Sequence, residues 1–204
     1  MKGHGHPAAA ATAGSHLDFL RGFLLRPKEV ASVVPSSPAL GAKVAEAGGA
    51  DRARVVVELG PGTGPVTREL LRRMAFDARL VAIERNPLFV RRLREAFDDP
   101  RLTIWAGDAQ AIARALAAAG ERQADLVVSG LPFPAMGERA GRIVLEAIRG
   151  VLAPHGRFVA YQLVSEVRRW ADPLFGPPEV RTVFRNLPPL RVFTWRREPP
   201  ARSA

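Results

Sequence analysis

Cysteine is absent from this 204-residue sequence, and histidine and long apolar runs are scarce. The lack of cysteine excludes disulfides and thiolate chemistry, which fits the reducing cytoplasm. No apolar run reaches the ~20 residues that a membrane-spanning helix needs, and the N-terminus lacks the apolar core and basic lead of a signal peptide. Because three of the four histidines lie within the first sixteen residues, we expect no metal site.

Lysine is also scarce, although the chain is strongly basic. It occurs only at Lys2, Lys28 and Lys43, so arginine supplies most of the 30 basic residues and of the formal net charge of +10. Such a basic surface is either an ordinary solvated surface or a binding surface for a polyanion. The polyanion would be nucleic acid or an anionic lipid surface. The length and the 47% hydrophobic content fit one globular domain with a single core.

The first 34 residues differ in composition from the rest of the chain. Residues 1–15 are mostly glycine, histidine, alanine and proline, which predicts a disordered leader. Residues 16–34 begin with an apolar stripe at helical spacing and a basic border, so this short amphipathic helix either packs on the edge of its own domain or lies on a membrane. The residues expected to contact a membrane are Leu17, Phe19, Leu20, Arg21, Phe23, Leu24, Arg26 and Lys28.

A glycine-rich turn follows an apolar run at residues 55–64, whose sequence is VVVELGPGTG. Three consecutive valines are typical of a strand buried on both faces, and the glycines allow backbone to approach a ligand closely. A helix that starts at Pro65 would point its free N–H groups at that ligand. The dinucleotide-binding pattern G-x-G-x-x-G needs glycine where this chain has Pro65. The pattern E-x-G-x-G-x-G instead resembles motif I of the doubly wound S-adenosylmethionine-dependent methyltransferases.

Two further strands end in acidic residues in the order that this resemblance requires. The run 79–83 leads to Glu84, twenty residues after Gly64, where a carboxylate can accept both ribose hydroxyls. The run 102–106 leads to Asp108, and the resemblance implies that this acid bonds the adenine amino group. The residues expected to bind S-adenosylmethionine, or its product S-adenosylhomocysteine, are Glu58, Gly60, Pro61, Gly62, Thr63, Gly64, Glu84, Arg85, Asp108, Ala109 and Ser129.

Strand-like and helix-like runs alternate along most of the chain, which predicts a parallel sheet with right-handed crossovers. The last two strand-like runs surround a Leu-Pro-Pro turn and predict an antiparallel hairpin. The expected fold is therefore α/β, a doubly wound, seven-stranded and mostly parallel sheet with a C-terminal antiparallel hairpin, Rossmann-like as in class I methyltransferases. Strands are expected at 55–59, 79–84, 102–106, 124–130, 156–163, 179–186 and 190–197. Helices are expected at 38–47, 65–75, 87–97, 109–119 and 137–152.

The loop after the fourth strand, S-G-L-P-F at residues 129–133, is where enzymes of this class meet the methyl acceptor. Open α/β sheets bind ligands beyond the carboxyl ends of their strands, so this loop is expected to face the glycine turn. Tyr161, the single tyrosine, is either a core aromatic or, with Phe133, a cage that holds the developing methylammonium by cation–π contact. The expected catalytic residues are Tyr161, Phe133 and Ser129. No dedicated base is evident, since His155 fits a turn residue better.

Several motifs together resemble the bacterial phospholipid N-methyltransferase family. They are F-L-R-G-F-L at 19–24, S-V-V-P-S-S-P at 32–38, V-E-L-G-P-G-T-G at 57–64, I-E-R-N at 83–86, S-G-L-P-F at 129–133 and R-N-L-P-P at 185–189. The resemblance covers roughly residues 17–197. It implies stepwise methylation of phosphatidylethanolamine toward phosphatidylcholine by a peripheral enzyme on the inner face of the cytoplasmic membrane.

The same resemblance sets the expected partners and boundaries. It implies that residues 16–34 bind an anionic membrane, that residues 35–198 form the methyltransferase domain, and that residues 199–204 are a tail. An obligate protein partner is not evident. The expected substrate-binding residues are Ser36, Ser37, Pro132, Phe133, Tyr161 and Arg185, the last for the lipid phosphate. Ser37 is also a natural N-cap for the helix that begins at Pro38.

Two alternatives remain open. The S-G-L-P-F loop is close to the N-L-P-Y/F loop of ribosomal RNA adenine dimethyltransferases, but those enzymes hold the adenine amine with asparagine, where this chain has Ser129 or Gly130. They also carry a helical domain after the sheet. Nucleic acid is therefore the less favoured partner. The third interpretation is a cofactor-binding membrane module that transfers no methyl group.

Overall fold

The structure is a computed structural model that describes residues 37–186 and 188–198. The predictions made for residues 1–34, for Ser36 and for the tail at 199–204 lie outside the described residues. The helices are α3 (Pro38–Gly48), α4 (Pro65–Arg73), α5 (Pro87–Ala96), the 3-10 helix η1 (Ala109–Ala111), α6 (Ile112–Ala118), α7 (Phe133–Met136), α8 (Glu138–Val151) and α9 (Glu166–Phe175). The strands are β1 (Val55–Leu59), β2 (Arg79–Glu84), β3 (Leu102–Ala106), β4 (Ala124–Ser129), β5 (Leu152–Gln162), β6 (Glu179–Val183) and β7 (Leu190–Arg196).

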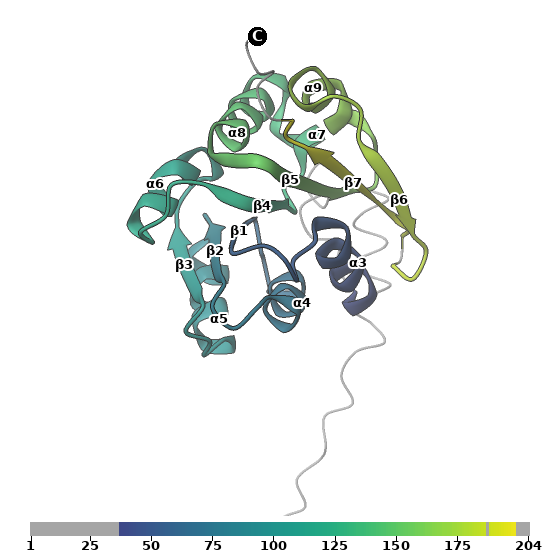
Figure 1. Cartoon of the computed structure of the whole chain (residues 1–204). Helices are drawn as coiled ribbons and strands as arrows, with labels where there is room; N and C mark the ends of the chain where they lie inside the picture. The colour runs from purple at the N-terminus through teal and green to yellow at the C-terminus, as the bar shows by residue number, and fades with distance from the viewer. Residues whose placement is uncertain (1–36, 187, 199–204) are drawn as a thin grey trace, which may run out of the picture. The chain divides into compact units, whose positions relative to one another are not determined.

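The strands form one seven-stranded sheet in the order β3-β2-β1-β4-β5-β7-β6. Strands β1 to β5 are parallel, and β7 is antiparallel to both of its neighbours. Helices α3, α4 and α5 lie on one side of the sheet, and α6, α8 and α9 lie on the other (Figure 1). The predicted fold class, including the C-terminal antiparallel hairpin, is thereby confirmed.

Apolar side chains from both faces of the sheet form the core. Val56, Val57 and Leu59 of the central strand β1 are fully buried, as expected for a strand covered on two sides. Around the C-terminal hairpin the core contains large rings, and Phe158 stacks on Trp195 with a centroid distance of 5.0 Å. Burial of each large apolar side chain contributes about 1.5–3 kcal/mol, so this core supplies the main force that holds the layers together.

Short polar signals set where α3 begins and ends. The Ser37 hydroxyl oxygen accepts a hydrogen bond from the N–H of Leu40 at 3.1 Å, and Pro38 occupies the first turn. The helix ends before Gly49, whose φ of 68° is left-handed. Ser37 therefore caps the helix, which was the second of its two expected roles.

The structure departs from the sequence prediction in several elements: α7 was not expected, the helix expected at 109–119 is divided into η1 and α6, and β6 ends at Val183 instead of residue 186. Residues 166–175 form α9, where no element was predicted, and the helix accommodates Pro173, a strong helix breaker, in its interior. Strand β5 begins at Leu152 instead of residue 156 and carries an irregularity in its pairing with β4. The expected turn around His155 (φ 65°) is that irregularity. Within the described ranges, no helix is long and apolar enough to cross a membrane.

Candidate cofactor and acceptor site

The strands that precede the predicted site residues end at one edge of the sheet. Leu59 of β1 pairs with Ser129 of β4, which in turn pairs with Ala160 of β5. We call this edge, where β1 to β5 end, the carboxyl edge. The strand order reverses between β1 and β4. From β1 the chain proceeds to β2 and β3 on one side, whereas β4 and β5 lie on the other side of β1. Open α/β sheets bind ligands at such a point.

The three glycines of the turn after β1 have different surroundings. Their φ angles are 71° at Gly60, 58° at Gly62 and 86° at Gly64, all in the region that favours glycine. A Cβ at Gly64 would lie 2.5 Å from the Phe97 ring, so Gly64 allows α4 to pack against that ring rather than exposing backbone to a ligand. A Cβ at Gly62 would meet nothing within 4 Å. The middle of the turn is therefore the part that is open to a ligand.

Glu84 is buried at the end of β2, with its carboxylate at the glycine turn. Its Oε2 accepts a hydrogen bond from the N–H of Gly62 at 3.2 Å, and its Oε1 accepts one from the N–H of Asn86 at 2.8 Å. The carboxylate thus lies directly beside the open part of the turn. This is the position expected for an acid that accepts paired hydroxyl groups.

Glu58 lies beneath the turn instead of on its surface. It is fully buried, and its Oε2 accepts a hydrogen bond from the Thr67 hydroxyl at 2.6 Å. Its Oε1 has no partner among the described residues. Burial raises the pKa of the Glu58 carboxyl to about 7; the bond from Thr67 opposes this rise and the negative charge of Glu84 adds to it. Glu58 therefore links β1 to α4 and supports the turn from beneath. We no longer expect Glu58 itself to contact a ligand.

The other residues expected at the cofactor differ in exposure. Asp108 is exposed, and its side chain accepts the backbone N–H two residues later and so caps η1. Thr63 and Arg85 are also exposed, whereas Pro61 and Ala109 are buried. The exposed three are available to a ligand, and the buried two shape the backbone around it.

The loop at residues 129–133, which we call the acceptor loop after its expected role, meets the glycine turn at Tyr161. A Cβ placed on Gly130 would overlap the Tyr161 hydroxyl and lie 3.1 Å from the carbonyl oxygen of Gly60. Ser129 is fully buried, and its hydroxyl oxygen accepts a hydrogen bond from the N–H of Leu131 at 3.3 Å. The structure thus brings the turn, the loop and the half-buried Tyr161 together, while Ser129 shapes the loop from inside.

Phe133 lies in the core. It is the first residue of α7, has no exposed surface, and belongs to the apolar cluster that contains Val144 and Trp170. A side chain without exposed surface does not form a wall for an entering amine. We therefore do not retain the expected cage of Phe133 with Tyr161. Tyr161 and Pro132, two other residues expected at the acceptor, are half-buried and keep some exposed surface.

Gln162 is a residue at this edge that the sequence analysis missed. Its Nε2 donates a hydrogen bond to the carbonyl oxygen of Leu131 at 2.8 Å and so ties the end of β5 to the acceptor loop. Gln162 is buried, with 6% of the residue exposed, and its Oε1 has no partner among the described residues. A polar residue at the end of a strand, next to Tyr161, was the only available signal.

The remaining expected residues lie farther from this centre. Arg185 is exposed in the turn between β6 and β7. His155 is exposed near the start of β5, at the edge of the sheet opposite the carboxyl edge. The position of His155 agrees with its interpretation as a turn residue and not a base.

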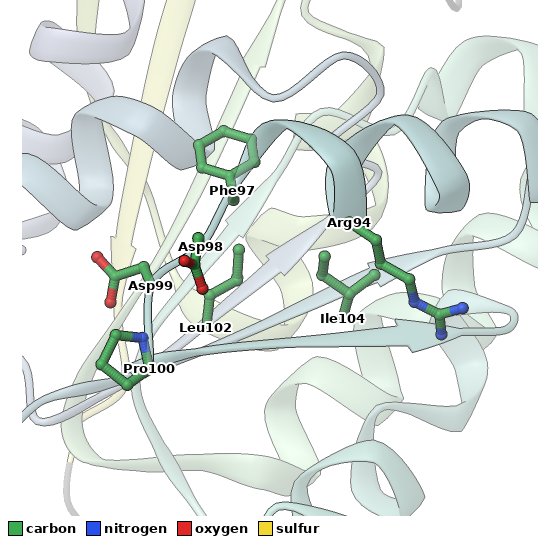
Figure 2. Close-up of a pocket in the computed structure, with 7 residues that line it drawn as sticks. All are labelled: Arg94, Phe97, Asp98, Asp99, Pro100, Leu102 and Ile104. Atoms are coloured by element: carbon green, nitrogen blue, oxygen red, sulfur yellow. The ribbon is translucent and has the colours of Figure 1, made fainter.

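Two surface cavities lie away from the predicted site residues. One, of about 350 Å³, lies between α5 and β3 (Figure 2), where the guanidinium of Arg94 points away from the carboxylates of Asp98 and Asp99. It is lined by Arg94, Phe97, Asp98, Asp99, Pro100, Leu102 and Ile104. The other, of about 450 Å³, is lined by Gln110, Met136, Gly137, Glu138, Arg139, Ala140 and Ile143. Neither is lined by an expected site residue.

Comparison with known proteins agrees with this geometry. A family model described as a methyltransferase domain matches residues 56–156. An ornithine lipid N-methyltransferase from Singulisphaera acidiphila is 38% identical over 183 residues, which cover 86% of this chain and 92% of that protein. A ribosomal RNA small subunit methyltransferase A from Burkholderia ambifaria is 38% identical over 87 residues, but the match covers 42% of this chain and only 32% of that protein.

A solved structure shows the same fold. The 1,6-didemethyltoxoflavin-N1-methyltransferase of Burkholderia thailandensis, determined with bound S-adenosylhomocysteine, superposes with a TM-score of 0.62 at 19% identity, over 95% of this chain and 94% of that one. The chain belongs to the class I S-adenosylmethionine-dependent methyltransferases, and a bacterial lipid N-methyltransferase is among its relatives.

S-adenosylmethionine is the cofactor of this chain. The observed residues fit it, because the turn is open at Gly62 and the Glu84 carboxylate lies beside that opening.

Proposed function

We propose that this protein transfers methyl groups from S-adenosylmethionine to the headgroup amine of an aminolipid at a membrane surface. The observation that carries the proposal is the 38% identity to an ornithine lipid N-methyltransferase over 92% of that relative. A match across 86% of this chain includes the acceptor loop as well as the cofactor turn. The ribosomal RNA relatives lack such extended similarity.

Two aminolipids are the first substrates to consider. The family motifs favour phosphatidylethanolamine and its methylated intermediates, which lead to phosphatidylcholine. The relative named above acts on ornithine lipid. Ethanolamine and ornithine both present a primary amine, so the same acceptor chemistry serves either lipid.

Some residues of the carboxyl edge would bind the cofactor, and others would bind the methyl acceptor. When bound, S-adenosylmethionine supplies a sulfonium methyl carbon that an amine lone pair attacks in line. Gly62 and Glu84 would hold the ribose side, and Asp108 the adenine. The loop at Gly130, held by Gln162, would orient the amine, and the Tyr161 ring would face its growing positive charge, a contact of roughly 0.5–2 kcal/mol. Orientation of this kind supplies much of the acceleration of a transfer reaction.

The test is incubation of the purified chain with labelled S-adenosylmethionine and a panel of aminolipids in anionic vesicles, followed by mass spectrometry. We expect mass increases of whole methyl groups on phosphatidylethanolamine or ornithine lipid. Absence of methylated lipid across the panel, from protein that binds the cofactor, would leave the inactive membrane module as the better interpretation.

The proposal also assigns residues 16–34 to membrane attachment. Support comes from their amphipathic sequence, with apolar residues at helical spacing beside arginine and lysine. Sedimentation with anionic vesicles, compared between the whole chain and one that lacks residues 1–34, tests this role. Equal sedimentation of the two would refute it.

A further inference from the structure

Large apolar side chains are exposed at the carboxyl edge of the sheet. Phe184 is 80% exposed in the turn between β6 and β7, and Val164 is 43% exposed in the loop after β5. Arg191, near the start of β7, donates a hydrogen bond to the Ser165 hydroxyl at 2.7 Å. The loop between β5 and α9 therefore lies beside the hairpin. Single exposed apolar residues are common on proteins, but here two occur on adjacent loops.

The turn between β6 and β7 projects from the same edge as the site. Strand β7 runs antiparallel to β5, and Arg191 pairs with Gln162 at the end of β5. The hairpin turn therefore extends past the edge where the Gly130 loop and Tyr161 meet the glycine turn.

The first described residue, Ser37, is bonded to this turn. Asn186 is buried, and its Oδ1 accepts a hydrogen bond from the N–H of Ser37 at 2.9 Å (Figure 1 shows the hairpin next to α3). Its Nδ2 donates to the carbonyl oxygen of Pro188 at 3.1 Å. The turn is thus held in place by partly buried hydrogen bonds, while Phe184 stays exposed.

The charge at this turn suits an anionic surface. Arg185 is exposed next to Phe184, and among the described residues it has no ion pair, whereas Arg181 on the preceding strand β6 forms ion pairs with Glu179 and Glu46. An exposed guanidinium without an ion pair to any described residue, beside an exposed aromatic ring, matches the boundary between lipid headgroups and acyl chains.

We infer that Phe184 and Arg185, the docking tip, bind the surface of an anionic lipid bilayer. The inference rests on the proposed lipid methylation, and deepens it. Docking through this tip turns the carboxyl edge toward the bilayer, so a lipid amine reaches the Gly130 loop without leaving the membrane.

The chain offers matched controls for a test. Phe76 is 91% exposed in the loop before β2, and Arg122 is exposed in the loop before β4; both lie at the opposite edge of the sheet. Each replacement at the docking tip can therefore be compared with the same replacement at the opposite edge.

The experiment measures binding of the whole chain to vesicles made of equal parts phosphatidylcholine and phosphatidylglycerol. We expect Phe184→Ser to lower the vesicle partition coefficient roughly tenfold and Arg185→Glu to lower it about fivefold or more at low salt. Phe76→Ser and Arg122→Glu should leave it unchanged. Wild-type binding by both tip variants, or equal losses in the control variants, would overturn the inference.

Two further measurements separate this inference from the proposed function. Phe184→Ser should keep its affinity for S-adenosylmethionine, which shows that it folds. Vesicle binding is measured without methyl transfer. Failure to methylate any lipid would therefore contradict the proposed function, whereas the vesicle partition coefficients alone decide whether the docking tip binds the bilayer. If the tip variants lose affinity for ribosomal RNA but not for vesicles, the tip binds nucleic acid and the inference is wrong.

Discussion

At the scale of single residues, Glu58 makes the fold sensitive to pH. An unfolded glutamate titrates near 4.5, and the buried Glu58 carboxyl near 7. Between these values the folded state keeps a proton that the unfolded state has released, so the free energy of unfolding falls as pH rises through this window. Above the pKa of the folded state, the loss in free energy of unfolding reaches its full value of about 3 kcal/mol.

Glu58→Gln should remove this dependence. We expect the free energy of unfolding of the wild type to fall by about 3 kcal/mol relative to Glu58→Gln between roughly pH 4 and pH 8. Denaturant unfolding at a series of pH values measures it, and Glu95→Gln, an exposed site on α5, serves as control. Parallel pH profiles for wild type and Glu58→Gln would contradict the assignment.

Gly130 is the residue that the arrangement of the site makes least replaceable. Gly130→Ala places a methyl group against the Tyr161 hydroxyl and 3.0 Å from Cζ of the same ring. We expect a loss of about 1–3 kcal/mol of stability together with reduced methyl transfer. Tyr161→Phe in the same chain should recover part of the stability, because it removes the closest atom.

Gly150→Ala is the matched control for that prediction. Gly150 lies in α8, and a Cβ there would meet nothing within 4 Å, so alanine should stabilise the helix by about 0.5–1 kcal/mol. Thermal unfolding compares the three variants with the wild type. Equal stability of Gly130→Ala and wild type would show that the loop and Tyr161 are not packed as described.

At the scale of elements, Asn186 joins the hairpin to the start of α3. Asn186→Ala leaves the partly buried N–H of Ser37 and carbonyl of Pro188 without these partners. The expected cost is about 1–3 kcal/mol in urea unfolding. Thr182→Ala, on the exposed part of the same hairpin, should change stability by less than about 0.5 kcal/mol. An unchanged midpoint for Asn186→Ala would mean that the hairpin and α3 are not coupled.

The strands were predictable because their signals are local. The valine run before Gly60 and the acids that end β2 and the β3 loop follow directly from residue order, and their parallel register follows from the strand–helix alternation. Helix α9 was not predicted. Val167, Trp170 and Ala171 stand at helical spacing and are buried on its inner face, but Pro173 in its interior is an unfavourable local signal. Tertiary packing overrides such a local preference.

The candidate site was predictable only in outline. Which strand ends meet is a property of topology, but which side chains face outward depends on packing across the sheet. Glu58 and Phe133 both match motif positions, yet one is bonded to Thr67 beneath the turn and the other fills the core. Gln162 belongs to no motif, and its bond to the Leu131 carbonyl appears only when β5 is placed beside β4.

At the scale of the whole molecule, the carboxyl edge combines three features that a membrane-surface methyltransferase needs. The open glycine turn with Glu84 lies there, the acceptor loop meets it, and the exposed hairpin turn projects from the same side. The formal net charge of +10 favours association with any polyanion. Charge alone therefore does not choose between a lipid and an RNA acceptor.

The most direct test of the central claim offers both acceptors to the enzyme in one reaction. Labelled S-adenosylmethionine is supplied with anionic vesicles that contain phosphatidylethanolamine and ornithine lipid, together with unmethylated small ribosomal subunits. After extraction, we expect the label in the lipid fraction and none in the ribosomal RNA. Label in RNA adenines, with none in lipid, would contradict the account.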